Sequence, residues 1–584
     1  MSSTEDLSAR AQTPSEAWTT FAKSRLDVIT DGSGAAPHMG RKARMETMRL
    51  ELAALEQCAI LAKQRCNSCS AASSLPVEIL ANIFAFAQAI WRPRVISDIV
   101  SGHPGFDLGW IYVTHICTSW RRAAIGAAHL WREISVLSVP PHMGTIILRR
   151  TLRLPLHLSI YLDDSNYVDD TPPVVQDWLC ASILPRIERL SIEAYTFEFE
   201  KWRSALNHPL PALRELVMDL SRSEDTAILE DDLLGGQCPQ LLSRLSLKNF
   251  IFFEGSKLFS PALTFLSIAM SETAEYDLAA LTTWGLRFQL ASMPNLEELH
   301  LSNILPYHRE SDAPQPVFRF LPTFKKLRVY CANSTVLSSC YKNFWDHFRF
   351  PNTAVIVSAL QIYEPSFDEE HAFGSITQID PSGIPPKELW ISQTTIKICF
   401  VERPREKWTR CWTATPTAGQ ISDRAKNATE GRYVYTNRRL VTAYASHRIL
   451  DSLRVINFSP TALEAFNTSD DTGVVWLSKF STNRLVRRIS AHYLACDKLF
   501  DALIQRDADT GTFHLFPVLE VVVLFANLNS GGRLHTALDM ALLDMLELRR
   551  ELGAPVKELL VAREMASWSV WDNVCEGTAI TFFD

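Results

Sequence analysis

Apolar residues recur at helical spacing in two neighbouring segments in the first quarter of the chain. The members of the first stripe are Ile79, Leu80, Ile83, Phe84 and Ala87. This spacing predicts a helix of about three turns. A second helix is predicted from 113 to 124, and Leu130-Trp131 follows after a short break. The two helices and this dipeptide together predict a small helical module over residues 74–134.

The segment before this module is also predicted to be helical. Residues 41–66 contain no Gly or Pro, and their apolar positions alternate between spacings of three and four. The seam residues are Met45, Met48, Leu52, Leu55, Ala59 and Ala62. Two interpretations stay open: the helix dimerises as a short coiled coil, or it packs against its own chain. Residues 1–40 are rich in Ser, Thr, Ala and Gly, and we expect them to be disordered.

After the module the pattern changes to an internal repeat. Its motif is Pro-x-apolar-x-x-apolar followed by an alternating strand. The final apolar residues of six copies are Leu190, Leu216, Leu245, Leu266, Leu299 and Leu327, separated by 26, 29, 21, 33 and 28 residues. Each copy predicts one short strand that pairs in parallel with its neighbours, followed by a covering helix such as 277–293. This period is that of leucine-rich repeats, loosened by insertions.

The repeat becomes harder to follow between 333 and 500. Strand-like runs continue there at 354–357, 453–456 and 474–477, but the proline signature is missing. Two late copies begin at Pro517 and Pro555, with a predicted helix at 534–552 between them. We therefore predict one irregular α/β solenoid over 137–570. Residues 364–388 and 401–435 are expected to be loops or insertions, and residues 571–584 to cap the open end.

Composition narrows the class of protein. The chain has 584 residues, of which 47% are hydrophobic and 21% charged, as in a soluble globular protein. No uncharged apolar run reaches 18 residues and the N-terminus is not a secretory signal, so we expect a cytoplasmic or nuclear protein without a membrane span. The twelve cysteines are then expected to be reduced thiols.

Motifs for common cofactors and catalytic sites are missing from the sequence. Cys66-Asn67-Ser68-Cys69 is a single Cys-x-x-Cys pair without the second pair of ligands that a zinc site needs. There is no Walker loop, dinucleotide-binding glycine motif or Gly-x-Ser-x-Gly elbow. We therefore expect no cofactor, no metal and no catalysis by this chain.

One part of the sequence is basic within an acidic chain. Residues 401–490 contain 15 Lys and Arg and 8 Asp and Glu, a net charge of +7, whereas the whole chain carries −7. The candidate partner-binding residues in these basic loops are Arg403, Arg405, Lys407, Arg410, Arg438 and Arg439. Aromatic residues such as Trp408 and Tyr433 are interleaved with them, so the loops could hold a phosphorylated segment. The alternative is solvated charges with the aromatics turned inward. Nucleic acid is an unlikely partner at a pI near 6.1.

Three segments of the helical module occur in an order that resembles an F-box. They are Leu75-Pro76-Val77-Glu78-Ile79-Leu80-Ala81-Asn82-Ile83-Phe84, then Cys117-Thr118-Ser119-Trp120-Arg121, then Leu130-Trp131. The insertion at 88–111 is longer than usual for this family. With its repeats, the chain resembles a fungal-type F-box protein with a leucine-rich-repeat-like solenoid.

The resemblance implies a substrate receptor of an SCF-type ubiquitin ligase. Its F-box would bind a Skp-family adaptor, and through it a cullin, while the solenoid would bind an unknown target protein. The residues that match the adaptor-facing first helix are Leu75, Pro76, Ile79, Leu80, Ile83 and Phe84. Those that match its supporting core are Cys117, Trp120, Leu130 and Trp131. The sequence does not separate the residues that touch the adaptor from those that fill the core.

Two functions of other classes compete with this interpretation. One is a scaffold that binds the Skp adaptor without delivering a target to a cullin. The other is an enzyme whose site lies in residues 333–500, where the sequence is hardest to interpret.

Overall fold

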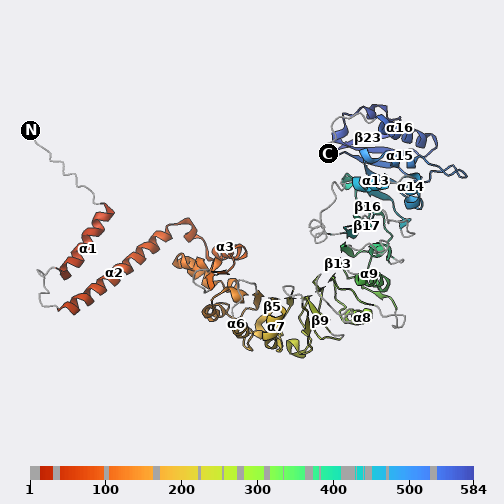
Figure 1. Ribbon diagram of the computed structural model, residues 1–584. Helices are drawn as coiled ribbons and strands as arrows, with labels where there is room; N and C mark the ends of the chain where they lie inside the picture. Colours follow the sequence, from red (N-terminus) through yellow and green to blue (C-terminus); the bar gives the residue numbers. More distant parts are fainter. Residues whose placement is uncertain are drawn as a thin grey trace, which may run out of the picture. The chain divides into compact units, whose positions relative to one another are not determined.

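The structure is a computed structural model, shown as a ribbon in Figure 1. It describes residues 13–30, 40–97, 104–161, 171–220, 225–252, 255–271, 282–307, 316–332, 335–361, 372–379, 383–409, 428, 430–437, 440, 450–467, 472–526 and 536–584. The chain divides into two compact units. Unit 1 is Met1–Glu133 with Ser138–Leu154, and unit 2 is Ile134–Leu137 with Pro155–Asp584.

Unit 1 is mainly helical. Its helices are α1 (Pro14–Thr30), α2 (Arg41–Ser68), α3 (Val77–Ile90), α4 (Thr118–Gly126) and α5 (Gly144–Arg150). Its 3₁₀ turns are η1 (Ala71–Ser74), η2 (Gly109–His115), η3 (Ala128–Trp131) and η5 (Pro141–Met143). The antiparallel strands β1 (Arg94–Ser97) and β2 (Pro104–Asp107) lie within the insertion between the two predicted helices. Helix α2 confirms the helix predicted at 41–66.

The expectation of disorder for residues 1–40 is wrong for 14–30, which form α1. A capping box begins this helix: the Thr13 amide donates to Glu16 Oε2 at 2.8 Å, and the Glu16 amide donates to Thr13 Oγ1 at 3.3 Å. Pro14 occupies the first helical turn, where its missing N–H costs nothing. Helix α1 contacts α2, and Arg25 forms an ion pair with Glu51.

The heptad seam of α2 stays largely exposed in the structure. No residue of α2 is buried, and Leu52 is 52% exposed, whereas Met48 and Leu55 are half-buried. Dimerisation through this seam and packing on the chain's own module both stay predictions.

Unit 2 is an α/β unit, so the predicted fold class is confirmed at this level. Its strands are β3 (Glu133–Ser135), β4 (Leu156–Tyr161), β5 (Ile187–Glu193), β6 (Glu215–Asp219), β7 (Ala227–Leu229), β8 (Arg244–Lys248), β9 (Phe250–Phe252), β10 (Phe265–Ala269), β11 (Glu298–Ser302), β12 (Phe318–Arg319), β13 (Lys326–Ala332), β14 (Phe348–Arg349), β15 (Val355–Gln361), β16 (Glu388–Ile391), β17 (Thr395–Cys399), β18 (Arg432–Thr436), β19 (Val455–Phe458), β20 (Arg488–His492), β21 (Val521–Phe525), β22 (Glu558–Ala562) and β23 (Ala579–Phe583). Its helices are α6 (Thr171–Trp178), α7 (Thr196–Trp202), α8 (Thr283–Ala291), α9 (Thr335–His347), α10 (Gly374–Thr377), α13 (Pro460–Asn467), α14 (Thr472–Phe480), α15 (Asp497–Leu503) and α16 (Thr536–Glu551).

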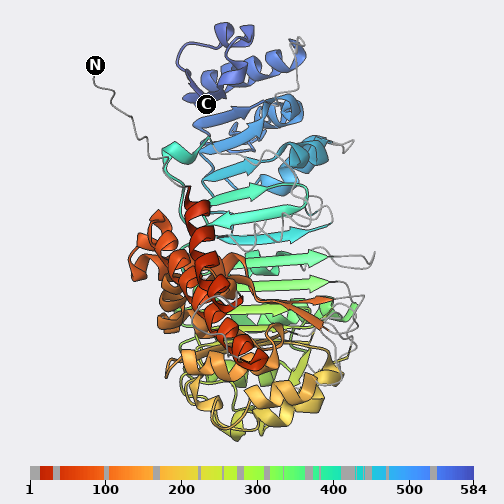
Figure 2. The same cartoon turned by 90° about the vertical axis from the view of Figure 1, so that its left-hand side faces the viewer.

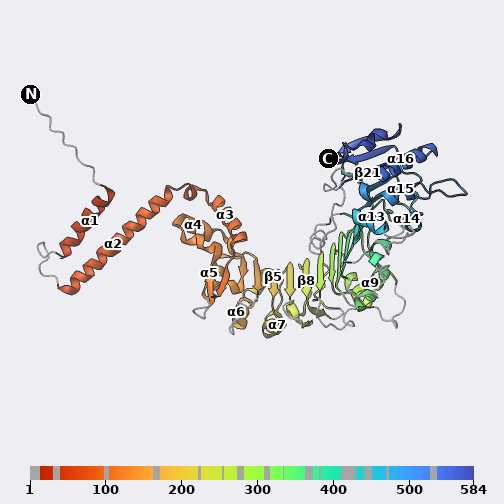
Figure 3. The ribbon, with the colours of Figure 1, turned by 45° about the horizontal axis from the view of Figure 1, so that its top comes forward.

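Most strands of unit 2 form one large mixed sheet that does not close into a barrel, whereas β7 pairs with β9 and β12 pairs with β14 in separate two-stranded sheets. Its paired strands run in the order β4, β5, β6, β8, β10, β11, β13, β15, β18, β17, β16, β19, β20, β21, β22, β23. Neighbours are parallel except around β17, which is antiparallel to β16 and β18. Figure 2 shows the strands as successive rungs. Helices α7, α8 and α9 lie along the outer side of the row (Figure 1 and Figure 3).

The repeat leucines form a continuous ladder on the helix-covered face of this sheet. Pairing joins Leu190 to Leu216, Leu216 to Leu245, and so on through Leu266, Leu299 and Leu327. Every one of the six is at most 1% exposed. These parallel, in-register pairs confirm the parallel pairing predicted from the repeat. Because side chains alternate between the faces of a strand, the residues between the leucines point to the opposite face, which we call the inner face.

Strands β8 and β11 are each followed by an asparagine whose side chain hydrogen-bonds to backbone groups at the ends of neighbouring strands. Asn249 Oδ1 accepts from the Ser271 amide at 2.7 Å, and its Nδ2 donates to the Leu220 carbonyl at 3.3 Å. Asn303 makes the equivalent bonds, to the Ala332 amide at 2.7 Å and the Met270 carbonyl at 3.1 Å. Both have positive φ, a conformation that asparagine tolerates better than most residues.

We expect Asn249→Ala to lower the free energy of unfolding of unit 2 by about 1–3 kcal/mol, because it leaves the amide of the half-buried Ser271 without its acceptor. The adjacent Lys248→Ala removes a partly exposed side chain and should change it by less than about 0.5 kcal/mol. Urea titration of the full chain, followed by circular dichroism, measures both. Equal midpoints for the two variants would show that the asparagine bridges do not stabilise the sheet.

The structure corrects three predictions in the second half of the chain. Residues 474–477 lie in helix α14 rather than a strand; the helix places the buried Trp476 one turn from Phe480, with ring centroids 5.7 Å apart. The predicted loops at 364–388 and 401–435 include α10, the first residue of β16 and most of β18. The predicted cap at 571–584 contains β23, which extends the sheet by pairing with β22.

Strands β16 to β18 depart from the repeat because they pair out of chain order. The chain leaves β15, enters the sheet again at β16 and turns back through β17, so that β18 lies beside β15. Strand β19 then pairs with β16 on the far side of this hairpin. Local periodicity carries no signal for such long-range pairing.

Candidate functional site

The candidate docking site lies on α3, which has two apolar faces rather than the single stripe that the sequence predicts. Leu80 and Phe84 point into the core of unit 1, and each is 1% exposed. The Phe84 ring lies 5.3 Å from the ring of Trp120. These two residues pack inside the module rather than on its surface.

The second face of α3 consists of Ile79, Ile83, Phe86 and Ile90, and we call it the outer face. Their spacing of four, three and four residues places them on one side of the helix. Ile83 is 42% exposed and Phe86 76% exposed. The exposed Glu78 and Asn82 border this face on one side, whereas on the other side it continues through the half-buried Ala87 to the buried Leu80. The outer face is therefore a row of apolar side chains without cover in unit 1.

Aromatic packing and one indole hydrogen bond hold the core beneath α3. The Trp131 indole donates to the Ala124 carbonyl at 2.8 Å, and its ring lies 4.9 Å from that of Trp110. The Arg150 guanidinium covers the same ring at 4.2 Å from its centroid. The side-chain amide of Gln88, on α3, donates from Nε2 to the Leu130 carbonyl at 3.0 Å, which fixes α3 against η3. Helix α3, which carries the outer face, is thus held against the core of unit 1.

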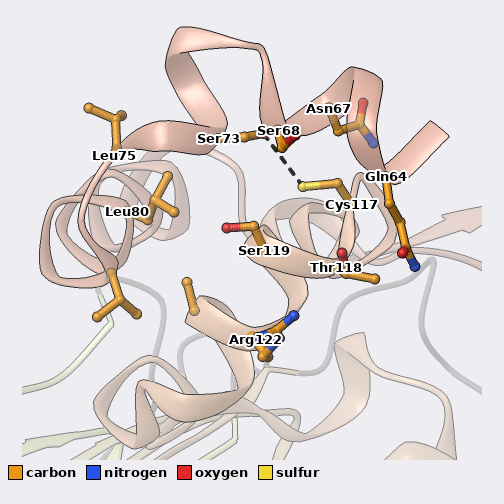
Figure 4. Close-up of a pocket in the computed structure, with 12 residues that line it drawn as sticks. Gln64, Asn67, Ser68, Ser73, Leu75, Leu80, Cys117, Thr118, Ser119 and Arg122 are labelled. Atoms are coloured by element: carbon orange, nitrogen blue, oxygen red, sulfur yellow. Dashed lines mark hydrogen bonds between the residues drawn. The ribbon is translucent and has the colours of Figure 1, made fainter. Parts of the chain in front are cut away.

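A cavity of about 460 Å³ opens between the end of α2 and the first turns of α3 and α4 (Figure 4). Leu75, Val77 and Leu80 contribute its apolar wall, and Ser119 and Arg122 of α4 line it as well.

Cys117 caps helix α4 at the edge of this cavity. Its Sγ accepts from the Trp120 amide at 3.4 Å and lies 3.8 Å from Ser73 Oγ. The cavity therefore combines an apolar wall with hydroxyl and guanidinium groups.

The structure divides the ten predicted F-box residues into three groups. Leu75, Pro76, Ile79 and Ile83 are exposed; Leu80, Phe84, Leu130 and Trp131 are buried; Cys117 and Trp120 are half-buried. The predicted helix 113–124 is two elements, η2 and α4, with the break at Cys117. Sequence analysis missed Phe86 and Ile90, although their spacing from Ile79 follows the helical period.

Two of the six candidate residues in the basic loops of unit 2 pair with carboxylates of the chain itself. Arg403 is half-buried and donates to Glu388 Oε1 at 2.8 Å, and Arg405 forms an ion pair with Glu558. Lys407 is exposed. Arg410, Arg438 and Arg439 lie outside the described residues. The positions of Arg403 and Arg405 favour internal pairing over partner binding for these two residues.

Glu388 is the centre of a buried polar network on the inner face of the sheet. Its Oε1 accepts from Asn457 Nδ2 at 2.8 Å and from the Trp390 indole at 2.9 Å. Arg488 NH2 lies 3.8 Å from Glu388 Oε2, and its guanidinium stacks 4.0 Å from the Trp408 ring centroid. Burial lowers the pKa of Arg488 to about 10, so it stays charged at neutral pH.

The described part of the chain holds no group of three or more His, Cys, Asp or Glu placed to bind a metal ion. Cys66 and Cys69 are free and exposed. No described helix has the length and apolar character needed to cross a membrane.

No protein-family model matches the chain, and the search of curated proteins found no match.

Proposed function

We propose that the chain is a substrate-recognition subunit of an SCF-type ubiquitin ligase. In this proposal unit 1 is an F-box that binds a Skp-family adaptor, and through it a cullin. Unit 2 is a leucine-rich-repeat-like solenoid that binds a target protein for ubiquitylation. The sequence resemblance over 74–134 and the in-register ladder of repeat leucines support the two assignments.

The outer face of α3 is the single observation that carries the adaptor assignment. An F-box-like helix needs one apolar face for its own core and a second for its partner. Here Leu80 and Phe84 supply the first, while Ile83 and Phe86 supply the second. Fully burying one such side chain is worth about 1.5–3 kcal/mol, so several together can support a stable protein interface.

We expect Ile83→Glu to weaken binding of the purified adaptor by more than about tenfold, because a carboxylate would be desolvated against an apolar partner. Asn82→Glu is the matched control: it adds the same charge at the neighbouring exposed position, off the outer face, and should bind as the wild type does. Titration calorimetry measures both affinities, and circular dichroism checks that both variants fold.

Isolation of the full chain from a cell extract tests the rest of the proposal. Adaptor and cullin together with the wild type, and neither with Ile83→Glu, are the expected result. Adaptor without cullin would favour a scaffold instead of a ligase receptor. Equal adaptor recovery with both variants would contradict the assignment of the outer face.

A further inference from the structure

A cluster of cations lies on the inner face of unit 2, on strands in the first half of the sheet. We call Arg244 of β8 and Lys326 and Arg328 of β13 the basic cluster. Between them lie Phe265 of β10 and His300 of β11. All five alternate with the buried ladder leucines, for example His300 with Leu299, so they point away from the helices.

The five side chains form a connected row across neighbouring strands. The Arg244 guanidinium lies 4.1 Å from the Phe265 ring centroid. The Phe265 ring meets that of His300 edge-on at 4.9 Å. His300 pairs in register with Arg328, and Glu298 with Lys326. The row therefore offers aromatic surface bordered by cations at both ends.

Positive charge is in excess at this place. The inner-face residues with charge on β8, β10, β11 and β13 are Arg244, Lys248, Lys326, Arg328 and Glu298, whereas those on β5 and β6 are Arg189, Glu193, Glu215 and Asp219. Burial, followed by repulsion from Arg328, Lys326 and Arg244, lowers the pKa of His300 to about 3. Glu298 Oε2 lies 3.7 Å from His300 Nε2.

The inner face of the second half is already occupied by the chain's own residues. Ala428 packs on Val357 and Tyr435 there. Trp408 packs on Val523 and Leu560. Ala428 also accepts a hydrogen bond from Lys326 Nζ of β13 at 3.3 Å, which uses one of the three protons of that ammonium. A partner that uses the inner face therefore has more room on β5 to β11 than beyond β15, and reaches Lys326 beside Ala428.

We propose that the basic cluster binds an acidic segment of the target protein, with carboxylate or phosphoryl groups between Arg244, Lys326 and Arg328. Phe265 and His300 form the floor of this site. The proposal deepens the assigned function, because it rests on unit 2 being the target-binding part. A short peptide fits better than a nucleic acid, since Glu215, Asp219 and Glu298 on the same face would repel an extended polyanion.

The test uses the full chain and two labelled peptides, hexaglutamate and a serine-rich peptide with one phosphoserine. We expect at least one to bind, with an affinity that falls as salt is raised. The double variant Lys326→Gln and Arg328→Gln should weaken that binding by at least about tenfold. Fluorescence anisotropy gives the affinities, and the peptide that binds more tightly identifies the anionic group.

Arg189→Gln is the matched control, because Arg189 lies on the inner face of β5 and is 59% exposed. Its peptide affinity should stay within about twofold of the wild type. Equal peptide binding by the double variant and the wild type, no binding of either peptide at low salt, or tighter binding of oligouridylate would each overturn the proposal.

The two proposals fail separately. The double variant should retain the adaptor, because the basic cluster belongs to unit 2 and the outer face of α3 to unit 1. If the expected peptide binding is not observed but the adaptor still binds, only the proposal for the basic cluster is rejected. Peptide binding without adaptor binding would reject the ligase assignment.

Discussion

Replacement of Glu388 by alanine is expected to lower the free energy of unfolding of unit 2 by about 3–5 kcal/mol, the usual cost of removing one partner from a buried ion pair. The Glu388 carboxylate is 0% exposed and accepts hydrogen bonds from Arg403, Asn457 and Trp390. Without it, the buried guanidinium of Arg488 would lose one of the two carboxylates that lie 3.8 Å from it, the fully buried one. Less of the positive charge in the interior of unit 2 would then be compensated.

Glu402→Ala is the control for this prediction. Glu402 lies 3.8 Å from Arg488 on the other side, but its side chain is 37% exposed. Its removal should therefore cost no more than about 1 kcal/mol. Chemical denaturation of the full chain, followed by tryptophan fluorescence, compares the two variants. If Glu388→Ala unfolds at the wild-type denaturant concentration, the network does not hold the strands together.

A second large effect is expected from Phe84→Ala, which should destabilise unit 1 by about 3–5 kcal/mol through the cavity it leaves. Phe84 is 1% exposed and packs against Trp120. Phe86→Ala, two residues further along the same helix, removes a ring that is 76% exposed and should change stability by less than about 0.5 kcal/mol. Differential scanning calorimetry separates the two.

These two phenylalanines also distinguish folding from binding. We expect Phe86→Ala to fold normally and to bind the adaptor more weakly, because its side chain belongs to the outer face. Phe84→Ala should lose binding only as far as it unfolds. Wild-type adaptor affinity in a folded Phe86→Ala protein would remove Phe86 from the interface.

Much of the fold could be predicted from the sequence because the repeat is local. A proline and two apolar residues recur ahead of each strand, and stacking such units aligns them; Leu245 and Leu266 therefore meet in register. The copy at Pro239 has one extra residue, which the structure absorbs by exposing Leu241 and burying Leu242. The α1 helix was also predictable in principle, since Thr13 and Glu16 are a capping box in the sequence.

The candidate site was predictable only in part. The sequence located α3 and the residues of its first turns, but it placed Ile83 and Phe84 on the same stripe. One lies on the outer face and the other in the core, because adjacent helical residues differ by about 100° around the axis. Which side faces the core depends on where Trp120 and Trp131 lie, and this is set by contacts between distant segments.

The sequence by itself determined the class of fold, the parallel register of the early strands and the position of the small helical module, because these depend on local periodicity. Only the tertiary structure decided which charged and aromatic side chains contact one another. It placed Arg403 against Glu388 and Trp408 on the inner face, and it brought Arg244 and Arg328 into one row. Such contacts depend on strand pairing and on loops that cross the sheet, and no spacing along the chain encodes them.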